Sequence, residues 1–218
     1  MQELLLLAVG AGMALLVWRW RADQQALKAR RSHFLDLVLP LLDSGLITQD
    51  GADYPSLSGV WRGVQVEIRP IADSIAVRKL PALWLSVSLV APTGQDVTLD
   101  ALQRASGVEY WSPSADLPRT LPVPAGWPET VRLAADGEPG QMLARVAEAG
   151  STFFADARAK ELLVTPKGVR LVVMLDEGAR GPYLLLRQAE FALDRLPADV
   201  VEALLLRAQD LLHRLQEP

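Results

Sequence analysis

The chain has 218 residues, of which 50% are hydrophobic and 22% are charged, with a formal net charge of -4 at pH 7. This length and balance fit a globular fold and exclude disorder over most of the chain. Because the arginines are spread along a mildly acidic chain, we expect no basic stripe for phosphates, and nucleic acid is not expected as a partner.

The N-terminal segment is the most apolar part of the chain. Residues 4–18 carry no charge, and Met1, Gln2 and Trp20 extend the permissible span to about twenty residues. About twenty apolar residues suffice for a helix to cross a bilayer, so we predict a transmembrane anchor over 1–20. Trp favours the headgroup level and Arg can extend toward water. Four residues are therefore predicted at the membrane interface: Trp18, Arg19, Trp20 and Arg21.

A cleaved signal peptide is the competing interpretation of this segment. It requires a positive stretch before the apolar run and a small-residue cleavage site after it. Only Met-Gln-Glu precedes the run here, and arginines follow it, so we expect an anchor. Two small-xxx-small pairs, Ala8 with Gly12 and Gly10 with Ala14, leave self-association of the helix open.

The basic residues that follow the anchor predict its orientation. Lys and Arg beside a membrane span stay on the cytoplasmic side, and the excess of Arg over Lys is typical of GC-rich bacterial genomes. We therefore expect a single-pass protein of the bacterial inner (cytoplasmic) membrane, with its N-terminus outside and its C-terminal domain in the cytosol.

Residues 21–44 are predicted to continue as a juxtamembrane helical stalk. Leu27, Phe34, Val38 and Leu41 follow a period near 3.6 residues, and Pro40 kinks or ends the helix. The soluble domain is then expected over residues 45–218.

The sequence of the soluble part predicts an antiparallel sheet with helices. Alternating or continuous apolar runs bounded by turns predict strands at 57–61, 64–69, 83–90, 131–134, 169–175 and 183–187. Apolar faces predict helices at 140–149, 156–163 and from Pro197 to near the C-terminus. The expected fold class is therefore α+β, with an antiparallel-sheet domain covered by helices.

Two stretches of the soluble part resemble each other. Each is a Gly-led strand, a link and a Pro-led strand, at 62–69 with 80–85 and at 167–174 with 181–186. One interpretation is two related β-rich halves, 45–102 and 129–218, joined by a Pro-rich connector over 103–128. The other is coincidence, because strands built from Val, Leu and Gly turns resemble one another without common descent. Both stay open.

The connector carries three large aromatic residues, Tyr110, Trp111 and Trp127. Exposed aromatics on a loop can mark a partner-binding site. The alternative is that they pin the loop to the core. We therefore keep all three as candidate partner-binding residues.

No catalytic, metal or cofactor signature is found in the sequence. There is no cysteine, which excludes thiol catalysis and Cys-ligated metals. His33 and His213 are the two histidines, too few for a His-based metal site. No phosphate-binding glycine loop and no G-x-S-x-G elbow occurs. We therefore assign no catalytic, cofactor-binding or metal-binding residue.

The leading hypothesis is a membrane-tethered, non-catalytic cytosolic module that binds a protein partner or itself, with the lipid bilayer contacting residues 1–20. One alternative is a lipid or small-ligand binding domain with an apolar pocket under the C-terminal helix, and another is an enzyme of unfamiliar type. An apolar cavity in the structure would favour the ligand-binding domain. A cleft with converging ionisable groups would favour the enzyme, and a solid core would favour the interaction module.

Overall fold

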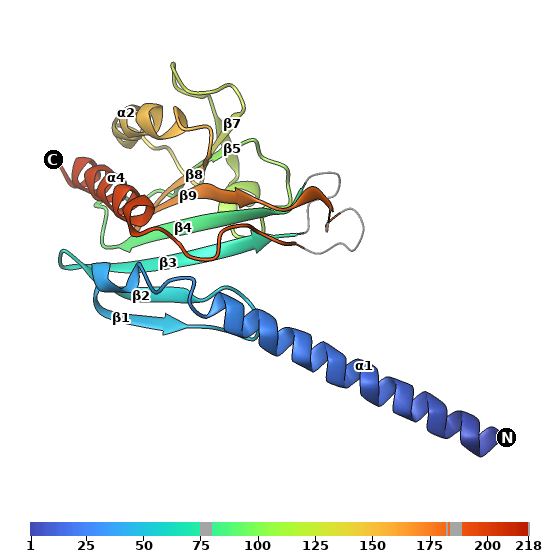
Figure 1. The fold of residues 1–218 in the computed structure, drawn as a ribbon. Coiled ribbons are helices and arrows are strands. Elements are labelled where there is room, and N and C mark those ends of the chain that lie inside the picture. Colours follow the sequence, from blue (N-terminus) through green and yellow to red (C-terminus); the bar gives the residue numbers. More distant parts are fainter. Residues whose placement is uncertain (75–79, 182, 184–188, 218) are drawn as a thin grey trace.

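The computed structural model describes residues 1–74, 80–181, 183 and 189–217, with the side chains of all of these except 2–6 and 8. Within these residues the chain forms an N-terminal helix, one nine-stranded antiparallel sheet, and two helices packed on it (Figure 1). The predicted α+β class, an antiparallel sheet covered by helices, is confirmed.

Helix α1 (Gln2–Arg31) projects away from the sheet toward the N-terminus (Figure 1). Large apolar side chains along it are exposed: Leu7, Val9, Met13, Leu15, Leu16, Val17, Trp18 and Trp20. Among the described residues, no helix reaches the length and hydropathy that a membrane crossing requires. The side chains of 2–6 and 8, which belong to the predicted anchor, lie outside the described set.

The chain after α1 turns into the domain instead of continuing as a helix. Residues 32–38 form turns, and a short 3-10 helix, η1 (Leu39–Leu41), has Pro40 in its first turn. Phe34, Leu35 and Val38 are fully buried in the core. The carbonyl of Phe34 accepts a hydrogen bond of 2.8 Å from the backbone N–H of Leu196. The base of the helix is therefore fixed to the domain by apolar packing.

The nine strands lie in the order β1-β2-β3-β4-β9-β8-β5-β7-β6, and every neighbouring pair is antiparallel. Their bounds are β1 (Asp43–Thr48), β2 (Ser56–Trp61), β3 (Val64–Asp73), β4 (Ala82–Val90), β5 (Leu99–Gln103), β6 (Arg119–Leu121), β7 (Val131–Ala135), β8 (Ala159–Thr165) and β9 (Gly168–Glu177). The predictions of strands at 57–61, 64–69, 83–90, 131–134 and 169–175 are confirmed.

The helix predicted at 156–163 is wrong, because most of this stretch is strand β8. Strand β8 pairs with β9 on one side and with β5 on the other, and its first six residues are buried. A strand covered on both faces shows no alternation that would distinguish it from a buried helix. For the strand predicted at 183–187, Tyr183 is helical, and 184–187 lie outside the described residues.

Strand β1 was not predicted, because the Asp, Ser and Gly residues at its start are typical of a turn. Its register with β2 shifts between Asp43 and Leu46, and Ser44 has a φ of 54°. These are the marks of a β-bulge, which accepts the same Ser and Gly residues as a turn. The short strands β5 and β6 were also not predicted. By sequence, strand β5 belongs mainly to the first of the two proposed halves, 45–102, but in the sheet it lies between β7 and β8 of the second half. The division into halves stays a prediction.

One face of the sheet carries the main core. Helices α2 (Met142–Phe154) and α4 (Ala198–Gln216) pack on this face (Figure 1). Alternate residues of the central strands point into it, for example Leu83, Leu85 and Val87 of β4, all with no exposed surface. The apolar stripe of α4 is buried against them, so the predicted C-terminal helix is confirmed. Burial of one such leucine contributes about 2 kcal/mol.

The opposite face of the sheet has a smaller apolar cluster and many polar side chains. Ile71, Trp84 and Val172 form the cluster with Ala82, and Trp111 of the connector packs against it. This second face holds the candidate site.

Candidate functional site

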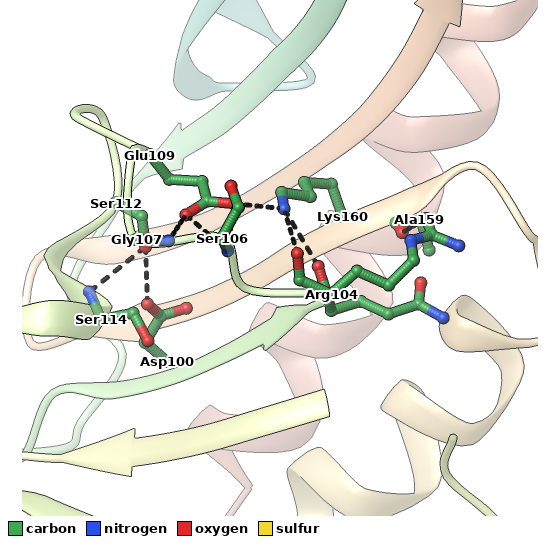
Figure 2. Close-up of polar contacts among 10 residues, drawn as sticks. Asp100, Arg104, Ser106, Gly107, Glu109, Ser112, Ser114, Ala159 and Lys160 are labelled. Atoms are coloured by element: carbon green, nitrogen blue, oxygen red, sulfur yellow. Dashed lines mark hydrogen bonds and ion pairs between the residues drawn. The ribbon is translucent and has the colours of Figure 1, made fainter. Parts of the chain in front are cut away.

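A buried ion pair fixes the first part of the connector to the second face of the sheet. Lys160 Nζ lies 2.6 Å from a carboxylate oxygen of Glu109, and the two side chains are only 5% and 4% exposed. Lys160 Nζ also donates to the carbonyl oxygens of Gln103 and Arg104, both at 3.1 Å (Figure 2). A buried charge is tolerated when its partner and remaining hydrogen bonds are all in place.

Glu109 is also bound by the loop in which it lies. Its carboxylate accepts hydrogen bonds from the backbone N–H of Ser106 and Gly107 and from the Ser106 hydroxyl (Figure 2). Burial alone would raise the pKa of this carboxyl, but the hydrogen bonds from Lys160 and Ser106 outweigh it and lower the pKa of Glu109 to about 2. The carboxylate therefore stays charged, and the loop closes around it.

Deeper in the same face lies a second polar cluster of Asp100, Glu161, Arg170 and Ser112. Ser112 Oγ donates to Asp100 at 2.9 Å, and Arg170 Nε donates to Glu161 at 2.8 Å. Asp100 and Glu161 have no exposed surface. Burial, reinforced by the charge of Glu161, raises the pKa of Asp100 to about 7, and burial also raises the pKa of Glu161.

These ionisable groups converge, but they are not in a cleft. One opening beside them, bounded by Gly107, Glu109 and Ser114 among others, has a volume of about 40 Å³, which is room for little more than water. The polar cluster therefore secures the connector. In the described part of the chain, no group of three His, Asp or Glu side chains is arranged to hold a metal ion.

The loop that these contacts secure presents Tyr110 to solvent. Tyr110 is 65% exposed, and its ring meets that of the half-buried Trp111 edge to face, with 5.1 Å between the ring centroids. Trp111 in turn contacts the buried Trp84, with 6.1 Å between ring centroids. Tyr110 is thus an exposed aromatic on a rigid support.

Tyr110 stands at one side of an open groove of about 630 Å³. We call it the Tyr110 groove and define it by six of its lining residues: Asp50, Asp53, Tyr54, Arg69, Tyr110 and Trp111. The other lining residues come from the end of strand β3 and from the loop between β1 and β2 with the adjoining strand ends. The groove is therefore shared by three segments that are distant in sequence.

The loop between β1 and β2 is attached to the end of α1. Gln49 Nε2 donates to the carbonyl of Lys28 at 3.3 Å, and Arg31 Nη1 donates to the carbonyl of Ala52 at 2.7 Å. The Arg31 guanidinium also lies 4.5 Å from the centre of the Tyr54 ring. The Tyr110 groove therefore begins where α1 meets the domain.

Carboxylates dominate the charge of the groove. Asp50 and Asp53 are exposed, whereas Arg69 is hydrogen bonded to Glu67 at 2.5 Å. Partial burial raises the pKa of the Tyr110 hydroxyl, and the negative charges of Asp73 and Asp53 raise it further. The tyrosine thus lies in a negative local potential.

The structure brings together two of the three aromatics that the sequence singled out. Tyr110 and Trp111 share the groove, but Trp127 lies in the main core on the other face, where it is 7% exposed. Trp127 Nε1 donates to the carbonyl of Ala147 at 2.9 Å, and its ring is 4.9 Å from that of Phe154. Trp127 therefore pins the connector to α2.

The four residues predicted at the membrane interface lie on exposed turns of α1. Trp18 and Trp20 are exposed, as is Arg21, and Arg19 lies 3.7 Å from Asp23 one turn later. Their role at a membrane stays a prediction.

Sequence reasoning missed the acidic side of the groove and the ion pair behind it. Asp50 and Asp53 occur in a turn where solvated charge is the ordinary explanation. Lys160 lies in the stretch predicted as a helix. No sequence pattern links the segment of Asp50 and Asp53, or that of Lys160, to the loop of Tyr110. These segments come together only through the order of the strands in the sheet.

A second groove, of about 270 Å³, lies between α2 and α4. Leu162, Leu171 and Leu211 line it but are almost fully buried. At its rim Arg214 pairs with Glu148 and Asp210. The leucines at the base of this groove therefore belong to the main core.

Comparisons with known proteins assign no family. No protein-family model matches the chain, and the comparison with curated proteins finds no match. Among solved structures, the chain is distantly similar in fold to the mycobacterial trehalose monomycolate transport factor A, TtfA. The TM-score is 0.35 and the sequence identity 10%, over 82% of this chain and 75% of that chain. A likeness at this level does not assign a function to the chain.

Proposed function

We propose that this protein is a membrane-tethered, non-catalytic module that binds a protein partner through the Tyr110 groove. The observation that carries the proposal is the exposed Tyr110 ring on a loop held by a buried ion pair. Exposed tyrosines on rigid supports are frequent energetic centres of protein interfaces, because they supply contact area with little entropy to lose.

The support for Tyr110 is built before any partner arrives. Glu109, its neighbour in sequence, is bound to Lys160, and Trp111 on the other side packs on Trp84. Ordering a loop on binding reduces affinity, so a loop ordered in advance retains more of the contact energy.

We place the anchor at residues 1–20, with Trp18, Arg19, Trp20 and Arg21 at the membrane interface. The exposed apolar side chains of α1 support this placement, because burying them in hydrocarbon removes them from water. The helix between Trp20 and Arg31 is ~16 Å long. The Tyr110 groove would thus face the zone just above the membrane. The basic residues after Trp18 favour the cytosolic side of a bacterial inner membrane.

Site-specific photocrosslinking tests the proposal. A benzophenone amino acid replaces Tyr110 in the full chain in its native membrane, and a matched variant carries it at Leu206, which is 43% exposed on α4. We expect a discrete crosslinked product from position 110 and none of that size from position 206. The same products from both positions, or none from either, would refute the proposal. A product of two copies of this chain would identify the partner as a second copy.

A further inference from the structure

We infer that the Tyr110 groove accepts a cationic polypeptide segment, a short stretch bearing Lys or Arg from a membrane-protein partner. This inference rests on the proposed function and adds the chemistry of the partner. It is supported by three features of the groove: its free carboxylates, its exposed aromatic ring, and its position at the end of α1.

The carboxylates of the groove are available for an incoming cation. Neither the Asp50 nor the Asp53 side chain makes a hydrogen bond or ion pair with another described residue. Arg69 is the cation among the described lining residues, and Glu67 already compensates its charge. A groove with two unpaired carboxylates attracts positive and repels negative segments.

The ring of Tyr110 provides a second element of cation recognition. A guanidinium or ammonium group placed over an exposed tyrosine face is attracted by the ring quadrupole. The chain already contains this arrangement at another lining residue, Tyr54, over which Arg31 lies at 4.5 Å. A cation between Tyr110 and the two aspartates would be held from both sides.

The position of the groove favours a partner from the same membrane. Cytoplasmic segments that flank membrane spans are rich in Lys and Arg. The Arg31 guanidinium of α1 lies over the ring of Tyr54, which lines the Tyr110 groove, and Arg31 also donates to the carbonyl of Ala52 in the same loop. With α1 in the membrane, basic juxtamembrane segments of a neighbouring membrane protein lie at the height of the groove. Anionic lipid headgroups, in contrast, would be repelled by Asp50 and Asp53.

A peptide titration of the full chain in lipid nanodiscs tests the inference. The chain has three tyrosines, so selective labelling of tyrosine rings with carbon-13 gives three sets of NMR signals, and Tyr110→Phe identifies those of Tyr110. The probes are the capped peptides Gly-Arg-Gly-Arg-Gly and Gly-Glu-Gly-Glu-Gly. We expect the arginine peptide to shift the Tyr110 signals, less so at high salt, and the glutamate peptide to leave them unchanged. Equal shifts with both peptides would overturn the inference.

Charge-removing variants provide the matched control. The double variant Asp50→Asn/Asp53→Asn keeps the turn chemistry and removes two negative charges. The variant Asp96→Asn/Glu202→Gln removes two exposed charges elsewhere. We expect the first variant to bind the arginine peptide at least about fivefold more weakly, which is about 1 kcal/mol, and the second to bind within about twofold of the unmodified chain. Equal affinity for all three proteins would overturn the inference.

Crosslinking at position 110 separates failure of this inference from failure of the proposed function. The crosslink at position 110 can persist although the arginine peptide does not bind, or it can be unchanged in Asp50→Asn/Asp53→Asn. Either result supports the proposed function and contradicts the inference of a cationic partner. Loss of the crosslink in that variant, together with weaker arginine-peptide binding, supports both.

Discussion

Replacing Lys160 by Met removes the cation from the buried pair and leaves the Glu109 carboxylate without its partner. Breaking a buried pair in this way costs about 3–5 kcal/mol. The pKa of Glu109 gives a second estimate. It is about 2 in the folded chain and 4.5 in a free peptide, so its ionisation stabilises the fold by about 3 kcal/mol at neutral pH. That contribution is present above about pH 4.5 and is lost as the pH falls toward 2.

We therefore expect Lys160→Met to lower the free energy of unfolding by about 3 kcal/mol. Glu109→Gln should cost less, because the remaining lysine still donates to the carbonyls of Gln103 and Arg104. The double variant should lose less than the sum of the single losses, with a coupling of at least about 1 kcal/mol, because no buried charge is then left unpaired. The loop of Glu109 can open to water in each variant, and the free energy of that opening is an upper limit to the stability that the variant loses.

Two measurements on the detergent-solubilised full chain check this expectation. Urea denaturation gives the free energy of unfolding, and hydrogen exchange over residues 103–112 reports the order of the loop. Lys167→Met is the control, because Lys167 is exposed in the turn between β8 and β9, and we expect it to stay within about 0.5 kcal/mol. If Lys160→Met changes neither stability nor exchange more than Lys167→Met does, the ion pair does not hold the loop.

Three further predictions concern the core, the buried carboxyl and the anchor. A Cβ at Gly150 would overlap the Trp127 ring, so Gly150→Ala should lower the free energy of unfolding by about 1–3 kcal/mol in urea denaturation; an unchanged stability would contradict this packing. Burial and Glu161 raise the pKa of Asp100 to about 7 from 3.8, so its stabilising contribution is full below about pH 4 and is lost as the pH rises through 7. Wild-type stability should fall from pH 5 to pH 8, and Asp100→Asn should flatten that fall; parallel curves would contradict the assignment. Deleting residues 1–20 should move the protein from the membrane fraction to the supernatant, and a C-terminal alkaline phosphatase fusion of the full chain should be inactive; an active fusion would reverse the predicted orientation.

The elements that could be predicted from sequence are those whose pattern is complete within one segment. Strand β3 begins with a clean alternation, and helix α4 shows an uninterrupted apolar stripe, so neighbouring residues alone specify their type. The helix prediction over strand β8 was wrong because Lys160 and Glu161 look like the polar side of a helix. In the sheet both are buried: Lys160 pairs with Glu109, 51 residues away, and Glu161 pairs with Arg170 of the neighbouring strand β9. Strand β1 was not predicted because Ser and Gly, which are typical of turns, occur there inside a strand, at its bulge.

For the candidate site, the sequence by itself singled out Tyr110 and Trp111, because large aromatics in a Pro-rich connector are unusual wherever they lie. It also determined that cysteine chemistry is absent and that an apolar N-terminal segment precedes an α+β domain. Only the tertiary structure separated Tyr110 from Trp127, which lie on opposite faces of the sheet.

Only the tertiary structure, likewise, placed Asp50 and Asp53 beside Tyr110. The physical reason is that burial and charge complementarity are properties of contacts between distant segments. The order of nine strands, which determines those contacts, results from the packing of the whole sheet and is not encoded in any one segment.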